Sequence, residues 1–140
     1  MITFLDHHTD LTHAGCELLV CWVNIGGIVT NSKLPLNNSN AYLIACSNKT
    51  LPLGGVLFYP AKMEQTRYIA NCAVKYRVMS KPIVHPVAAA MNKVRMFIDR
   101  KRIVSAGIPA APGIPAQDFE KIVRNAFSTC DCNIIISPKG

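Results

Sequence analysis

The sequence predicts an α/β protein, a three-layer α/β/α sandwich built around a six-stranded mixed sheet. Runs rich in β-forming residues alternate along the chain with segments whose apolar residues recur at helical spacing, which is typical of this fold class. The runs 18–23 and 134–136 have no polar face, as expected of central strands that are covered on both sides. The chain of 140 residues contains no repeat and no linker, so we expect residues 1–140 to form one domain.

Six segments are apolar and rich in β-forming residues, and we expect each of them to be a strand. In chain order they are Ile2–Leu5, Glu17–Val23, Val56–Tyr59, Tyr68–Val74, Ile103–Gly107 and Asn133–Ser137. The second and the last contain the uninterrupted apolar runs, which places them inside the sheet rather than at its edges.

Two segments are expected to be helices, because their apolar residues form a stripe along one face. The first, Pro86–Arg102, begins with a proline suited to the first helical position. Its stripe consists of Ala90, Met91, Val94, Phe97 and Ile98. The second helix, Ala116–Ser128, has a stripe of Phe119, Ile122, Val123, Ala126 and Phe127. A third, short helix is expected around Asn40–Asn48, after the loop 35–39.

Positive charge exceeds negative charge, with 15 Lys and Arg against 8 Asp and Glu and a formal net charge of +7. Such a surplus is typical of proteins with a polyanionic or phosphate-bearing partner, although it also serves solubility. One basic group, Lys75, Arg77 and Lys81, follows a predicted strand and could meet phosphates. The other, within 93–102, is expected to be a solvated helix face and its last turn. Half of the residues are hydrophobic and 16% are charged, a balance that excludes intrinsic disorder.

The sequence carries no signature of export, of a membrane span or of a metal centre. The N-terminal segment lacks the features of a secretory leader, and the longest apolar run, Leu18–Val29, falls short of the ~20 residues that span a bilayer. We therefore expect a cytoplasmic protein without membrane association and without a cofactor. There is no CxxC pair, and Cys130-x-Cys132 is too tight for the common zinc spacings, so reduced thiols are expected. The early histidines match no metal-ligand signature: His7, His8 and His13.

Two loops follow the carboxyl ends of predicted strands, where open α/β sheets bind their ligands. The first, from Asn24 to Ile28, contains two consecutive glycines, which let the backbone approach an anion closely or simply form a tight turn. The second, from Pro109 to Pro115, leads into a helix whose free N–H groups favour an anion. Its three prolines remove donors, so a rigid connection is the alternative. Neither GxGxxG nor a P-loop motif is present.

Several strings, in this order of elements, resemble a macro domain over nearly the whole chain. The string from Arg67 to Lys75 resembles the R-Y-I-I-N-F-P-T-K segment of the branch that contains ADP-ribosyl hydrolase antitoxins acting on ADP-ribosylated DNA. In the same branch an Asp-hydrophobic pair, here Asp10-Leu11, precedes a strand ending in V-N-x-V-N-x-V-G, here 20–27. The stretch 103–127 resembles the strand, glycine-rich loop and helix that close the family's ligand cleft.

The resemblance implies a nucleotide site whose first half follows the second strand. Asp10 would accept a hydrogen bond from the adenine amino group, or else be a solvated turn or helix cap, and Leu11 would lie beside it. Asn24 would lie near the distal ribose, or simply end the strand. The first phosphate loop would be formed by Gly26, Gly27 and Ile28.

The resemblance places the second half of the site around the other loop and the end of the fourth strand. Gly113 and Ile114 would belong to the second phosphate loop, and Phe119 would be the aromatic residue that follows it, although Phe119 also fits the core stripe. Lys75 matches the branch's catalytic lysine, which would act on the distal ribose through a desolvation-lowered pKa and an amine–carbonyl adduct. The alternative for Lys75 is a generic basic surface.

The sequence departs from the family pattern at both loops. Cys21 replaces the first Asn of the pattern, and residues 30–32 stand where the branch has Gly-Lys-Gly. Pro112 and Pro115 remove backbone donors from the second loop, and Pro115 stands where some relatives place a catalytic acid.

Three functions remain open on this basis. The first is a module that binds ADP-ribose or a related NAD-derived nucleotide, which needs no catalytic group. The second is an ADP-ribosyl hydrolase acting on modified nucleic acid or protein through Lys75. The third is a macro fold reused as an interaction protein without a nucleotide. The sequence does not indicate an oligomeric state.

Overall fold

The computed structural model describes residues 1–7, 11, 14–25, 44–61, 63–75 and 84–138. Its centre is a six-stranded sheet with the order β1-β6-β5-β2-β4-β3. The strands are β1 Ile2–Phe4, β2 Leu18–Asn24, β3 Val56–Pro60, β4 Tyr68–Lys75, β5 Ser105–Pro109 and β6 Asn133–Ser137. The edge strand β3 is antiparallel to β4, and the other neighbours are parallel. The predicted six-stranded mixed sheet is confirmed.

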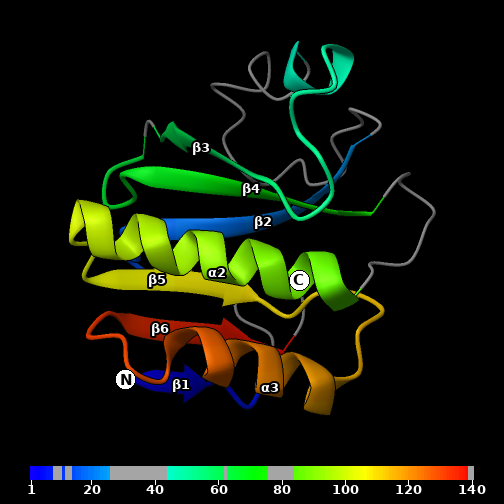
Figure 1. Cartoon of the computed structure of the whole chain (residues 1–140). Coiled ribbons are helices and arrows are strands. Elements are labelled where there is room, and N and C mark those ends of the chain that lie inside the picture. Colours follow the sequence, from blue (N-terminus) through cyan, green and yellow to red (C-terminus); the bar gives the residue numbers. More distant parts are fainter. Residues whose placement is uncertain (8–10, 12–13, 26–43, 62, 76–83, 139–140) are drawn as a thin grey trace.

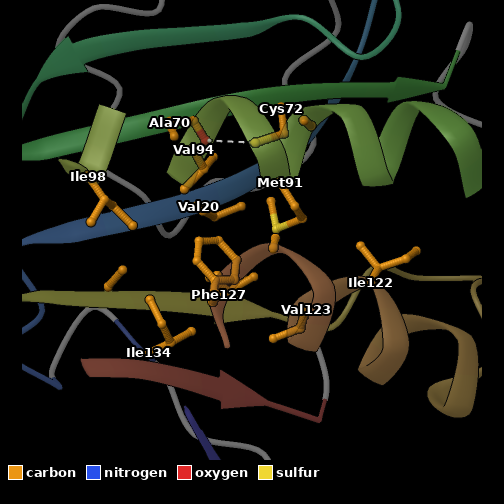
Figure 2. Packing of buried hydrophobic residues seen from close by; sticks show 14 of the residues in the cluster. Val20, Ala70, Cys72, Met91, Val94, Ile98, Ile122, Val123, Phe127 and Ile134 are labelled. Atoms are coloured by element: carbon orange, nitrogen blue, oxygen red, sulfur yellow. Dashed lines mark hydrogen bonds between the residues drawn. The ribbon is translucent and has the colours of Figure 1, made fainter. Parts of the chain in front are cut away.

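The helices α2, Val84–Lys101, and α3, Ala116–Phe127, lie side by side on one face of this sheet (Figure 1). The stripes predicted for both helices are buried there, together with alternate side chains of the strands. Figure 2 shows how Met91 and Val94 of α2 and Val123 of α3 face Val20 of β2 across this core. No helix in the described part of the chain is both long and apolar enough to cross a bilayer.

The opposite face of the sheet is covered by a second set of contacts. Val23 of β2 and Ala73 of β4 point away from the main core, and Ala45 and Cys46 of the helical turn 44–47 pack against them. This turn is the described part of the short helix predicted around 40–48. Helical residues therefore lie on both faces, as the α/β/α prediction requires.

The prediction for the fifth strand was wrong by two residues at each end, because Ile103 packs against the end of α2 and does not join the strand. Arg102 adopts a left-handed conformation with φ 54°, which ends the helix. The Ile103 N–H then donates to the Ile98 carbonyl at 3.0 Å, and its side chain is buried against the helix. The strand therefore begins at Ser105 instead of Ile103.

The start of the first long helix also differs from its prediction. The helix begins at Val84, so Pro86 occupies its third position and not its first. This is compatible with a proline, because the first-turn N–H groups of a helix have no partner within the helix.

Gly107 in the middle of β5 is required by close packing. A Cβ atom there would lie 3.0 Å from Leu19 Cδ2, 3.2 Å from Cys16 Sγ and 3.4 Å from Leu11 Cβ. We expect Gly107→Val to lower the free energy of unfolding by about 1–3 kcal/mol, measured by urea denaturation, because the core must shift to admit the branched side chain. Val104→Ala, at a 64% exposed position in the same segment, should change it by less than about 0.5 kcal/mol. Equal stability of the Gly107 variant and the wild type would show that this face is loosely packed.

Candidate functional site

The topology identifies the edge of the sheet formed by the carboxyl ends of its parallel strands as the place for a ligand. From β2 the chain proceeds to β3 and β4 on one side, whereas from β5 it proceeds to β6 on the other side. The strands β2 and β5 are neighbours, so the strand order reverses between them. Open α/β sheets bind ligands outside the carboxyl ends of the strands at such a switch point. The two loops singled out in the sequence follow these two strand ends.

The strands β2 and β5 separate as they approach this edge. Within the described residues they are paired in register only at Leu18–Ala106 and Leu19–Gly107. Further along, the Trp22 indole N–H donates to the Pro109 carbonyl at 2.6 Å, so a side chain bridges the two strands where the backbone ladder has ended. In contrast, β5 and β6 remain paired as far as Pro109 and Ser137.

Asn24 and Lys75, the two residues predicted to lie at the distal ribose, are opposite each other at the ends of β2 and β4. The register shifts just before this pair, because β4 contributes one more residue, Val74, between Ala73 and Lys75 than β2 does. The Ile25 N–H then donates to the Lys75 carbonyl at 3.0 Å and holds the two ends together. Irregularities of this kind turn side chains out of the regular alternation and are frequent next to active sites. The Asn24 side chain is buried, and Lys75 is half-buried.

The second loop joins β5 to α3 at the same edge. The Ala110 N–H donates to the Ser137 carbonyl at 2.8 Å, and the Ile114 N–H donates to the Ala111 carbonyl at 3.3 Å. Gly113 has φ 83°, a left-handed conformation that glycine adopts without strain. Pro115 precedes the helix without a side-chain cap. The N-terminus of α3, with its free first-turn N–H groups, therefore follows this loop directly.

Three of the predicted ligand-binding residues pack in the hydrophobic clusters of the protein. Phe119 is buried, and its ring packs edge-on against the Trp22 ring at a centroid distance of 6.0 Å and an angle of 82°. Ile114 packs against the same core. Leu11 is buried on the other face with Cys16 and Leu19.

Four predicted site residues lie outside the described residues: Asp10, Gly26, Gly27 and Ile28. The same holds for Arg77, Lys81, His8 and His13. In the described part of the chain, no three His, Cys, Asp or Glu side chains are grouped so that they could hold a metal ion.

Sequence reasoning missed two residues at this edge, Trp22 and Ser137. Trp22 is the only tryptophan of the chain and precedes Asn24 by two positions, which was an available signal. Ser137 is a fully buried polar residue at the end of β6, opposite Pro109. Its burial has no signature in the sequence.

The six cysteines are free thiols, as predicted. Cys21, which replaces an Asn of the family pattern, is half-buried on β2, and burial raises its pKa to about 11. Burial also raises the pKa of Cys132 to about 12. Because the thiolate is the reactive form, this rise lowers the reactivity of the Cys21 thiol at neutral pH.

The fold was compared with known proteins. No protein-family model matches the sequence, and no curated protein matches it significantly. Among solved structures, the macrodomain of Thermus aquaticus DarG superposes with a TM-score of 0.87 at 21% identity, covering 98% of this chain and 97% of that one. The macrodomain of Mycobacterium tuberculosis DarG gives a TM-score of 0.86 at 22% identity, covering 99% of both chains.

A third solved structure is a longer protein. Thermosipho africanus DarTG in complex with ADP-ribose gives a TM-score of 0.82 at 12% identity, and the match covers 96% of this chain but 40% of that one. Together with the six-stranded mixed sheet and its switch point, these superpositions show that the chain has the macrodomain fold.

Proposed function

We propose that the chain binds ADP-ribose or a related NAD-derived nucleotide at the carboxyl edge of its sheet. The observation that carries the proposal is the pairing of Asn24 with Lys75 at the carboxyl ends of β2 and β4, because β2 is one of the two strands that form the switch point. Two proteins with the same fold have related ligands in their solved structures: Thermosipho africanus DarTG has ADP-ribose, and the Oceanobacillus iheyensis macrodomain has ADP.

In the proposed site, different residues contact the adenine, the diphosphate and the distal ribose of the nucleotide. Asp10 accepts a hydrogen bond from the adenine amino group. The diphosphate lies between the loop 26–28 and the loop around Gly113, where glycines and the start of a helix offer backbone N–H groups. The distal ribose then reaches Asn24 and Lys75.

The adenine contact provides the first test of this site. We expect isothermal titration to show saturable binding of ADP-ribose by the wild type, and Asp10→Ala to weaken it by about 1–3 kcal/mol, as for a hydrogen bond to a charged group. Asp131→Ala is the matched control, because Asp131 is exposed and precedes β6 at the other end of the sheet, and it should leave the affinity unchanged. Unchanged affinity in a folded Asp10→Ala variant would remove the adenine assignment. A wild type that takes up no ADP-ribose would favour the interaction protein.

A second candidate function, an ADP-ribosyl hydrolase, is favoured by the position of Lys75 beside Asn24. Hydrolysis would consume one water and release ADP-ribose from its acceptor, with Lys75 acting on the distal ribose. Modified nucleic acid is the proposed substrate, because the net charge of +7 attracts a polyanion. Release of ADP-ribose from modified DNA, compared with release from modified protein, tests this choice.

A further inference from the structure

Trp22 contacts both ends of the second loop. Its indole N–H donates to the carbonyl of Pro109, the last residue of β5, at 2.6 Å. The same ring packs edge-on against Phe119 in the first turn of α3. The loop 110–115 lies between these two contacts, so one side chain of β2 contacts the residues before and after it.

The loop makes few hydrogen bonds among the described residues, although Ala111 is buried in the main core and Ala110 and Ile114 pack against it. Pro112 and Pro115 have no N–H group, and the hydrogen bond between Ile114 and Ala111 is internal to the loop. The Ala110 N–H, which donates to the Ser137 carbonyl, ties the loop to β6. The contact with β2 is made by Trp22, at a level where β2 and β5 have ceased to pair.

We propose that Trp22 is the positioning residue of the second loop. It fixes the distance between β2 and the start of α3, so the loop already forms one wall of the nucleotide site before the ligand binds. The inference rests on the proposed function. A wall that is already in place removes the entropic cost of ordering a loop on binding. A fixed loop also compensates for the backbone N–H donors that its prolines lack, because the remaining N–H groups of the loop are held in one arrangement.

The test compares Trp22→Phe with Tyr59→Phe. Trp22→Phe keeps an aromatic ring next to Phe119 but removes the N–H that holds Pro109. Tyr59 is also a buried aromatic residue with one polar group, and it lies on β3 opposite Ile69, far from the carboxyl end of β4. Tyr59→Phe therefore removes the polar group of a buried aromatic side chain without affecting the loop.

Two measurements separate positioning from plain stability. We expect both variants to have lower thermal midpoints, but only Trp22→Phe to bind ADP-ribose about tenfold more weakly in isothermal titration. In hydrogen exchange of the ligand-free proteins, the amides of 110–114 should exchange faster in Trp22→Phe and at the wild-type rate in Tyr59→Phe.

The outcomes also separate this inference from the proposed function. If Trp22→Phe exchanges like the wild type over 110–114, or binds ADP-ribose within twofold of it, Trp22 is not the positioning residue. If the wild type itself does not bind ADP-ribose, the proposed function fails. Faster exchange over 110–114 in Trp22→Phe would then still support the fixing of the loop, and wild-type exchange would overturn it.

Discussion

Replacing Phe127 by alanine is expected to lower the free energy of unfolding by about 3–5 kcal/mol. Phe127 is 1% exposed at the end of α3 and belongs to the core that joins both helices to the sheet. Figure 2 shows its ring among the side chains of Val20, Met91 and Val123, so truncation leaves a cavity that three elements line. Because the surrounding packing relaxes only in part, both the lost burial and the cavity contribute.

Urea denaturation measures this effect, and Met96→Ala is its control. Met96 lies on α2 but is 66% exposed, so its truncation should change the free energy of unfolding by less than about 0.5 kcal/mol. If Phe127→Ala lowered the free energy of unfolding by less than about 1 kcal/mol, the result would contradict a close-packed core between α3 and β2.

If the chain is a hydrolase, Lys75→Ala is expected to reduce the turnover of a modified substrate by at least about 10³-fold, which corresponds to ~4 kcal/mol of transition-state stabilisation. The affinity for ADP-ribose should stay within about threefold of the wild type, because a group that acts on the transition state contributes little to binding of the product. This expectation rests on the role proposed for Lys75, which lies opposite Asn24 at the end of β4. Single-turnover assays and isothermal titration measure the two quantities separately.

Lys101→Ala is the matched control for this experiment, since Lys101 is an exposed lysine at the end of α2. It should leave turnover and affinity unchanged. Turnover that persists in Lys75→Ala would assign Lys75 to a generic basic surface. Absence of turnover in the wild type, together with ADP-ribose binding, would leave the binding module as the function.

Much of the fold could be predicted from the sequence because it depends on local periodicity. The stripe of α3 is buried as the spacing of its apolar residues indicates, and β6 has the predicted bounds. The start of β5 could not be predicted in this way. An apolar Ile103 fits both the start of a strand and the end of a helix. The left-handed conformation of Arg102 decides that Ile103 packs at the end of α2.

The candidate site depends on contacts between distant parts of the chain. The resemblance singled out Asn24 and Lys75, but their pairing required the register of β2 against β4. Trp22 and Pro109 are 87 positions apart, so no local pattern could indicate their hydrogen bond. Phe119 fits both the core stripe and the aromatic residue that follows the family's second loop, so the sequence left its role open, and the structure buries it in the core against Trp22.

The most direct test of the central claim is a crystal structure of the protein soaked with ADP-ribose. The nucleotide should lie at the carboxyl edge of the sheet, between the segments 24–30 and 109–116. Its adenine should contact Asp10, and its distal ribose should be within hydrogen-bonding distance, about 3 Å, of Asn24 or Lys75. A nucleotide bound elsewhere on the molecule, or a distal ribose beyond hydrogen-bonding distance of both Asn24 and Lys75, would contradict this account.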